Sequence, residues 1–265
     1  YVLQHTAQDV TDAGGFAAVT DEQLGAFTDL WTQRYIHDEL NDFREKSARF
    51  TYLFRRLCRQ VRQVVADMAH ELRAGDFVPL DFELNFADPE QIAPITLSDG
   101  EVTLNMSGVA DRVDGWLHDG KLYLRVVDYK TGGKEFKLKE VYCGLDCQML
   151  LYLFTLERNA KRQFPGATAA GVEYLLADPA PKSVDRSELG DDADPAPTYP
   201  MNGLLLDEES IYRAMDTKGT GEFVPLSFSA KTGKPLNAKS TLADTAKLGR
   251  IRDHLDGLLI DMAKN

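Results

Sequence analysis

The sequence predicts an α/β protein in which helices flank a mixed central sheet. Two long stretches with apolar residues at every third or fourth position open the chain, at 20–46 and 47–74. From residue 77 the apolar residues alternate with a period of two, which is typical of strands. Helical spacing returns at 138–161 and again at 238–263. This order indicates an N-terminal helical extension, a core rich in strands and a C-terminal helix.

The two N-terminal helices are bounded by residues suited to helix ends. Thr20, which is followed by two acidic residues, is a suitable N-cap for the helix at 20–46. Gly75 is a suitable stop for the helix at 47–74. We therefore expect both helices to extend over most of these ranges.

Four short alternating runs make up the first part of the predicted sheet. They lie at 77–86, 92–97, 101–117 and 121–130. Asp119 and Gly120 form a pair typical of two-residue hairpin turns, so we expect the last two runs to pair as a hairpin.

The rest of the chain is predicted to complete the sheet and then to close with helices. GVEYLLAD at 171–178 is a further strand, and 179–200, rich in Pro, Asp and Ala, is a loop. A short helix near 207–216 and a strand near 223–229 precede the last helix. We predict one domain, divided into a helical extension (1–75), a core (76–178), a loop (179–200) and a C-terminal elaboration (201–265).

Length and composition narrow the class of protein. With 265 residues, 43% of them apolar, the chain can bury a sizeable core. The sequence has no run of 18 apolar residues and no signal-peptide pattern, so we expect no membrane span and a cytoplasmic location. The net charge of −12 disfavours autonomous nucleic-acid binding, although a bound metal ion would supply positive charge locally.

Two smaller features have competing interpretations. Arg55, Arg59 and Arg62 form one stripe on the second helix, which fits a solvated face or an edge that contacts a nucleic-acid backbone. Cys143 and Cys147 are four residues apart, and without a further Cys or His pair we expect buried small side chains rather than a zinc site.

The most informative segment places two carboxylates and an amine at strand ends. Asp111 lies early in one strand of the predicted hairpin, and Asp128 and Lys130 close the other. Because side chains at i and i+2 share a face, Asp128 and Lys130 project together while Tyr129 points to the other side. A salt-bridged sheet can imitate an Asp-X-Lys pattern by itself, and Asp111 is the residue that favours a functional site.

This set of side chains suits phosphodiester hydrolysis. Mg²⁺ prefers hard oxygen ligands and keeps several waters, so Asp111, Asp128 and the backbone carbonyl of Tyr129 could hold it. Lys130 could orient the attacking water or help to deprotonate it.

Three motifs resemble a known family. GVADRVD (108–114), VVDYKTG (126–132) and QMLLY (148–152) are similar to the G-x-x-D, D-Y-K and Q-x-x-x-Y motifs of the RecB-like branch of the PD-(D/E)XK nuclease superfamily. The resemblance implies a restriction-endonuclease-like core. It also implies that Asp111 and Asp128 bind the metal and that Lys130 is catalytic.

The helix motif adds two residues to the candidate site. Gln148 and Tyr152 match its glutamine and tyrosine, and at i and i+4 they share a helix face. A core aromatic is an equal alternative for Tyr152. Glu83 lies where the superfamily often has an acidic residue, and it is a candidate for the metal or its surroundings or else a strand surface carboxylate. Asp114 alternates to the face opposite Asp111, which suits a structural or exposed residue.

Further segments resemble the B subunits of AddAB-type ATP-dependent helicase-nucleases. They are residues 134–153, the strand that begins at Gly171, and MNGLLLDEE at 201–209. The resemblance implies a Mg²⁺-dependent DNA exonuclease, with Mn²⁺ as an alternative ion, that acts in double-strand break processing and recombinational repair. Its single-stranded DNA would be delivered by a helicase partner subunit, since the chain lacks G-x-x-x-x-G-K-[ST].

The sequence departs from this family in two places. A metal-binding histidine in a G-T-x-x-H pattern is absent, and Tyr1-Val2-Leu3 resembles the residues that come directly after that histidine, so we expect the ligand to lie outside the sequence. His5 and His37 are candidates to replace this ligand, by residue type only. The C-terminal cysteine cluster that holds an iron-sulfur centre in many relatives is also absent, so we expect no such centre here.

Two other functions remain open. The same fold could serve as a non-catalytic DNA-binding or scaffold module, which the acidic charge and the absent histidine favour. A metal-free sugar- or nucleotide-binding α/β domain with a structural Asp–Lys pair is the third interpretation.

Overall fold

The computed structural model describes residues 1–44, 46–88, 92–130, 135–161, 164–176, 201–229 and 231–264. It divides into two compact units, Tyr1–Asp76 and Phe77–Asn265. The division falls beside the expected boundary between the helical extension and the core, while the single domain stays a prediction. No helix in the described ranges has the length and apolar character needed to cross a membrane.

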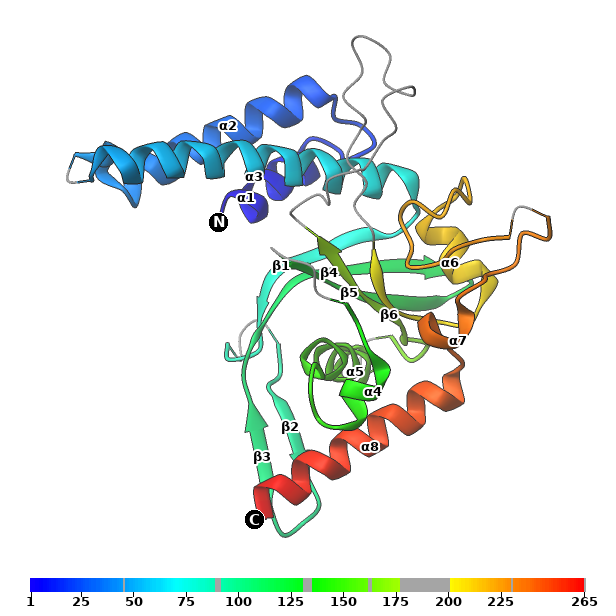
Figure 1. Cartoon of the computed structure of the whole chain (residues 1–265). Coiled ribbons are helices and arrows are strands. Elements are labelled where there is room, and N and C mark those ends of the chain that lie inside the picture. The colour runs from blue at the N-terminus through cyan, green and yellow to red at the C-terminus, as the bar shows by residue number, and fades with distance from the viewer. Residues whose placement is uncertain are drawn as a thin grey trace. The chain divides into compact units, whose positions relative to one another are not determined.

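The N-terminal unit consists of helices. They are α1 (Val2–Asp12), α2 (Asp21–Asp38), the short 3-10 helix η1 (Asn41–Phe43) and α3 (Ala48–Ala74). Figure 1 shows α2 and α3 running alongside each other, and both helices also contact α1.

The helix ends follow the expected capping chemistry, with one correction. Thr20 Oγ1 accepts a hydrogen bond from the Gln23 N–H, and the Gln23 side chain accepts one from the Thr20 N–H, so a full capping box starts α2. Helix α3 ends at Gly75 as predicted. The helix predicted to reach residue 46 is wrong at its end, because α2 stops at Asp38 and the residues of η1 have positive φ angles that a helix cannot continue through.

Polar contacts tie the N-terminal unit together. The Trp31 indole N–H on α2 donates to Asp9 of α1 over 2.7 Å. Near the end of α3, Arg73 donates to the carbonyls of Phe16 and Val19 and pairs with Asp21. The loop between α1 and α2 is therefore held by one arginine from α3.

The second unit is built on a mixed six-stranded sheet in the order β1-β4-β5-β6-β7-β8. The pairs β5–β6 and β7–β8 are parallel and the other pairs are antiparallel, which confirms the predicted fold class. Its strands are β1 (Val78–Asn85), β4 (Val109–His118), β5 (Lys121–Lys130), β6 (Thr168–Leu176), β7 (Asn202–Leu206) and β8 (Leu242–Ala243). A separate hairpin is formed by β2 (Ile95–Ser98) and β3 (Thr103–Met106).

The predicted hairpin between β4 and β5 is confirmed. Its two-residue turn is Asp119-Gly120, with φ angles of 48° and 73°. Positive φ at both central residues is the geometry of the turn that matches strand twist. The hairpin brings the segment with Asp111 beside the segment with Asp128 and Lys130.

The single helix predicted at 138–161 is wrong, because the chain breaks it into α4 (Leu138–Tyr142) and α5 (Gln148–Ala160). Gly144 has a φ of 76° and its N–H donates to the Val141 carbonyl, while the Leu145 N–H donates to Glu140. These bonds form a Schellman motif, which ends α4. The two cysteines at 143 and 147 therefore do not share a helix face, and they are exposed and half-buried rather than buried.

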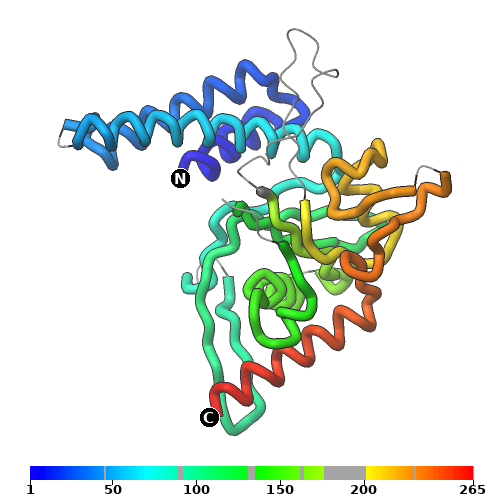
Figure 2. The backbone as a smooth tube through the Cα atoms, viewed as in Figure 1, coloured from blue at the N-terminus to red at the C-terminus, as the bar shows by residue number. Residues whose placement is uncertain are grey.

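Helix α5 packs against β5 and β6 and forms the centre of the core. The order of β5, α4, α5 and β6 along the chain can be traced in Figure 2.

Helix α8 (Thr245–Lys264) contacts α4, α5 and the β2–β3 hairpin. At its end Lys264 pairs with Asp99 and Glu101 near the hairpin tip. Its ammonium, with help from the backbone N–H groups of Val102 and Glu101, lowers the pKa of Asp99 to about 2. These ion pairs hold the tip of the hairpin to the end of the last helix.

The C-terminal predictions are only partly confirmed. Helix α6 (Glu209–Met215) lies where a short helix was expected. The strand expected at 223–229 is wrong, since Pro225 has no N–H to donate and only the bridge between Phe228 and Pro235 forms there. The last helix, predicted from 238, starts as α7 (Ala238–Thr241) and resumes as α8 after β8. The loop predicted at 179–200 lies outside the described residues.

Candidate active site

The candidate site begins where β4 and β5 run side by side. Arg112 pairs with Val127 in their antiparallel ladder, so the next position sets Asp111 across from Asp128. Asp111 Oδ2 also accepts a hydrogen bond from the Tyr129 backbone N–H over 2.9 Å. Opposed residues in such a ladder have Cβ atoms about 5 Å apart. The two aspartates predicted to share a metal therefore stand next to each other.

Lys130 completes this group from the same strand as Asp128. Its Nζ lies 2.5 Å from Asp128 Oδ2, which confirms that the two side chains share a face. The ammonium also lies 5.6 Å from the centre of the Tyr174 ring on β6. The side chains of Lys130 and Asp128 are only 30% and 15% exposed, so the pair is partly shielded but still reached by solvent.

The surroundings of Asp111 disfavour the charged form of its carboxyl group. Burial raises the pKa of Asp111, and the charges of Asp128 and Glu83 raise that pKa further. The Tyr129 N–H and the Lys130 ammonium act in the opposite direction without cancelling the effect. Crowded carboxylates of this kind favour a bound proton or a bound cation.

Glu83 joins the row from the neighbouring strand β1. Phe82 pairs with Arg112 and Leu84 with Ala110, which puts Glu83 across from Asp111. Its φ of 54° is unusual for a residue inside a strand, and its side chain is exposed. The structure thus brings the third expected acidic candidate beside Asp111.

The first two turns of α5 supply Gln148 and Tyr152. Gln148 Nε2 donates to the Tyr152 hydroxyl over 2.5 Å, as expected for an i and i+4 pair. The Tyr152 ring is buried, stacks on Phe86 and lies against Gly108, where a Cβ atom would collide with the hydroxyl oxygen. Gly108 precedes β4, so this contact fixes α5 beside the strand that carries Asp111.

The other face of the sheet holds a buried charge network that the motifs did not reveal. Arg125 donates to Asp114 and Glu173, and Arg112 donates to Asp114, with each side chain at most 2% exposed. Arg112 also donates to the Tyr129 hydroxyl over 2.8 Å, which confirms that Tyr129 points away from its neighbours in sequence. The signal in the sequence was the Arg112-X-Asp114 spacing, which places opposite charges on one strand face. This arrangement gives Asp114 a buried structural position.

Comparison with known proteins identifies the family of this chain. The family model described as PD-(D/E)XK nuclease superfamily matches residues 2–256. The chain belongs to this superfamily.

Curated relatives of this nuclease-superfamily chain are named as the B subunit of an ATP-dependent helicase/deoxyribonuclease. The protein from Clostridium acetobutylicum is 31% identical over 229 residues, which cover 83% of this chain and 19% of the relative. The protein from Thermoanaerobacter sp. is 30% identical over 228 residues, with the same coverage. That from Clostridium botulinum strain Hall is 30% identical over 246 residues, or 87% of this chain and 21% of the relative. The chain thus spans about a fifth of the length of these relatives.

Superfamily nucleases generally use divalent metal ions, and the residues present fit one. Asp128 Oδ2 is buried and is paired with the Lys130 ammonium, and no other described residue donates a hydrogen bond to it. Asp111 Oδ2 accepts the hydrogen bond from the Tyr129 N–H, and Asp111 Oδ1 remains available as a metal ligand. No group of three or more His, Cys, Asp and Glu side chains in the described ranges is placed to hold a metal. Two carboxylates would therefore need carbonyl and water ligands beside them.

The two histidines considered as replacement ligands have other contacts. His5 stacks on Trp31 with ring centres 4.1 Å apart. His37 Nδ1 lies 3.2 Å from Asp42 Oδ2. Both belong to the N-terminal unit, and their roles as ligands stay a prediction.

Proposed function

We propose that this chain is the metal-dependent deoxyribonuclease part of a helicase-nuclease and that it hydrolyses phosphodiester bonds of single-stranded DNA. The observation that carries the proposal is the placement of Asp111, Asp128 and Lys130 at one end of the β4–β5 hairpin. The names of the relatives support DNA as the substrate and a helicase partner.

Asp111 and Asp128 would hold the ion, with the Tyr129 carbonyl and waters as further ligands and Glu83 close to Asp111. A bound Mg²⁺ neutralises the charge that develops on the phosphate and activates water. Mn²⁺ has similar ligand preferences and would serve as an alternative.

Lys130 would bind the attacking water or a phosphate oxygen. Its ammonium offers three donors, and only part of this capacity is used by Asp128. The Tyr174 ring on the neighbouring strand lies 5.6 Å from the ammonium and attracts its positive charge. A lysine so positioned can orient the attacking water or help to deprotonate it.

Gln148 and Tyr152 would orient the DNA strand rather than transfer protons. The Tyr152 hydroxyl accepts from the Gln148 amide, which leaves the Gln148 carbonyl oxygen and the tyrosine O–H for a further partner. Because Tyr152 is packed against Gly108 and Phe86, this pair is held rigidly. Exonuclease action and a role in double-strand break repair belong to the same proposal.

The test measures cleavage of end-labelled single-stranded DNA by the 265-residue chain in Mg²⁺ or Mn²⁺. Asp128→Ala and Lys130→Ala should each abolish cleavage, whereas Lys264→Ala, which removes a lysine paired with carboxylates at the end of α8, should not. Equal cleavage by wild type and the two site variants contradicts the proposal. Metal binding without cleavage in any preparation favours the non-catalytic module instead.

A further inference from the structure

The first half of α3 carries an unusual concentration of positive charge. Residues 46–62 contain six basic residues and no Asp or Glu, in a chain whose net charge is −12. Five of the six are arginines, and we call four of these the arginine band: Arg49, Arg55, Arg56 and Arg59. All four are exposed, and together they span about 15 Å of helix at 1.5 Å per residue.

The arginine band has no acidic partners in the described part of the chain. Elsewhere in the N-terminal unit, Arg44 lies beside Asp42, Arg62 beside Asp29 and Arg73 beside Asp21. None of the four band arginines forms such an ion pair with a described residue. In a chain with 42 acidic and 30 basic residues, this lack of pairing marks the band as different from an ordinary solvated face.

The spacing of the band costs helix stability unless an anion binds. Arg55 and Arg59 are four residues apart and Arg56 and Arg59 are three apart, so each pair lies on neighbouring turns of one face. Like charges at these spacings destabilise a helix by a few tenths of a kcal/mol per pair. A ligand with regularly repeated negative charge would remove this repulsion.

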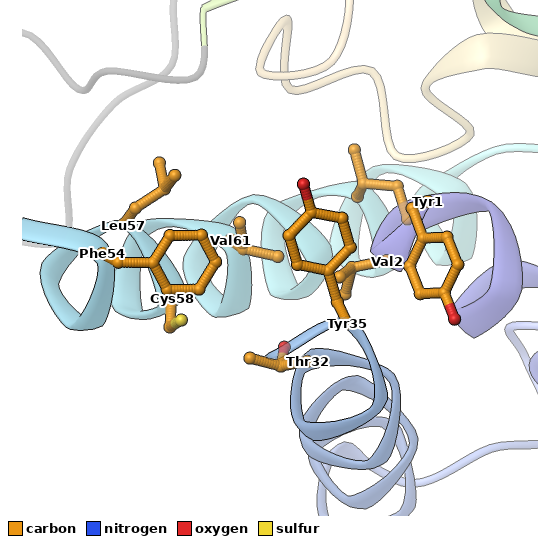
Figure 3. Close-up of a pocket in the computed structure, with 9 residues that line it drawn as sticks. Tyr1, Val2, Thr32, Tyr35, Phe54, Leu57, Cys58 and Val61 are labelled. Atoms are coloured by element: carbon orange, nitrogen blue, oxygen red, sulfur yellow. The ribbon is translucent and has the colours of Figure 1, made fainter. Parts of the chain in front are cut away.

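The opposite face of α3 is occupied by apolar packing. Phe54, Leu57 and Val61 line a cavity of about 240 Å³ with Tyr1 and Tyr35 from the start of the chain and from α2. Figure 3 shows that these lining residues come from the start of the chain, from α2 and from α3. The arginines, which fall between these positions in sequence, are therefore left on the outside of the helix.

An exposed aromatic ring lies in line with the band. Tyr52 is 65% exposed and precedes Arg55 and Arg56 by three and four residues, so it shares their face. Phe50, next to Arg49, is 38% exposed. Proteins that bind single-stranded nucleic acids combine aromatic rings with basic side chains. The exposed bases stack on the rings, and the phosphates contact the cations.

We propose that the arginine band with Tyr52 is a binding surface for single-stranded DNA, separate from the candidate active site. The inference rests on the proposed function, which makes DNA the substrate. A duplex offers the same phosphates but keeps its bases stacked inside, so it would use the arginines without the ring. The strand would bind across successive turns of the first half of α3, where none of the residues before Val64 is buried.

The test compares two variants with the same change of net charge. The band variant combines Arg49→Gln, Arg55→Gln, Arg56→Gln and Arg59→Gln, and glutamine preserves helix propensity. The control combines Lys121→Gln, Lys218→Gln, Lys239→Gln and Arg250→Gln, all exposed residues of the second unit. Binding of labelled oligo(dT) is measured by fluorescence anisotropy in EDTA over a range of salt concentrations, with circular dichroism to verify helix content.

We expect the band variant to bind oligo(dT) at least about ten-fold more weakly than the control. The slope of log affinity against log salt should flatten by up to about 0.7 per lost phosphate contact. Equal binding by the two variants overturns the proposal. A band variant that binds oligo(dT) normally but no longer associates with the helicase partner assigns the band to a protein interface and overturns it too.

The variant Tyr52→Leu tests whether the band binds single-stranded DNA through base stacking. It should weaken binding of oligo(dT) several-fold and leave binding of inorganic polyphosphate unchanged, because only the oligonucleotide has bases to stack. Equal losses for both ligands contradict a stacking role. Since binding is measured without metal, cleavage retained by Asp128→Ala counts against the proposed function alone, and normal binding of oligo(dT) by the band variant counts against this inference alone.

Discussion

The backbone N–H of Tyr129 donates to Asp111 Oδ2, and the Tyr129 hydroxyl accepts from Arg112 on the opposite face of the sheet. One residue thus links the candidate metal ligand Asp111 to the buried charge network. Because Tyr129 lies between Asp128 and Lys130, the same residue fixes the end of β5 on which both depend. Tyr129 therefore connects the sheet face that carries the candidate site to the face that carries the buried charge network.

The first prediction concerns the stability of Asp111→Asn. Burial, with help from Asp128, raises the pKa of Asp111 above its ordinary value of 3.8, so the folded chain holds this proton more tightly than the unfolded chain. The stability contributed by this group is complete below its unfolded pKa and is lost as pH rises through the raised folded pKa. In EDTA, the variant should therefore lose less stability than wild type between about pH 4 and pH 7.

Urea unfolding at a series of pH values measures this difference, and asparagine can still accept the Tyr129 hydrogen bond. Added Mg²⁺ should stabilise wild type and leave the variant unchanged, because only wild type keeps both carboxylates. Identical pH dependence of the two proteins would show that Asp111 is not held in an unfavourable charged state.

The second prediction separates metal binding from catalysis. Lys130→Met should lower the cleavage rate by about a hundred- to ten-thousand-fold while Mn²⁺ still binds, since the variant frees Asp128 Oδ2 from its ion pair. Asp128→Asn should weaken both properties. Isothermal titration with Mn²⁺, run beside the cleavage assay, distinguishes them, and Lys264→Met is the control. Loss of Mn²⁺ binding in Lys130→Met would mean that the lysine organises the ligands instead.

The third prediction concerns the contact between Gly108 and Tyr152. Gly108→Ala should destabilise the fold by about 1–3 kcal/mol, because the new Cβ atom would collide with the Tyr152 hydroxyl oxygen. Gly257→Ala, in an open position on α8, should stabilise it by about 0.5–1 kcal/mol. Chemical denaturation measures both. Adding Tyr152→Phe to Gly108→Ala should recover part of the loss, and no recovery would place the strain elsewhere.

The fourth prediction concerns the buried network. Arg125→Met should cost about 3–5 kcal/mol, because Asp114 and Glu173 would each lose a buried cationic partner. Arg213→Met, which removes an exposed pair with Glu209, should cost only about 0.3–0.5 kcal/mol. Thermal and urea unfolding provide the comparison. A loss for Arg125→Met no larger than that for Arg213→Met would show that the network contributes little.

Much of the fold followed from local patterns. The helix α3, the N-cap at Thr20 and the β4–β5 hairpin are each specified by residues close together in sequence, so local patterns predicted them. The failures have local and long-range causes. The break before α5 depends on one glycine with positive φ, and apolar spacing continues through it. Strand β7 was missed because it is identified by its pairing with β6 and β8.

By itself the sequence determined which residues form the candidate site, since Asp111, Asp128, Lys130, Gln148 and Tyr152 lie in motifs whose order and spacing are visible in the chain. Only the tertiary structure decided which groups surround them. The position of Glu83 beside Asp111, the link from Tyr129 to Arg112 and the absence of ion pairs at the arginine band among described residues all depend on contacts between distant segments. Local spacing sets the face on which a side chain lies, whereas burial and the partners across a sheet set its charge environment.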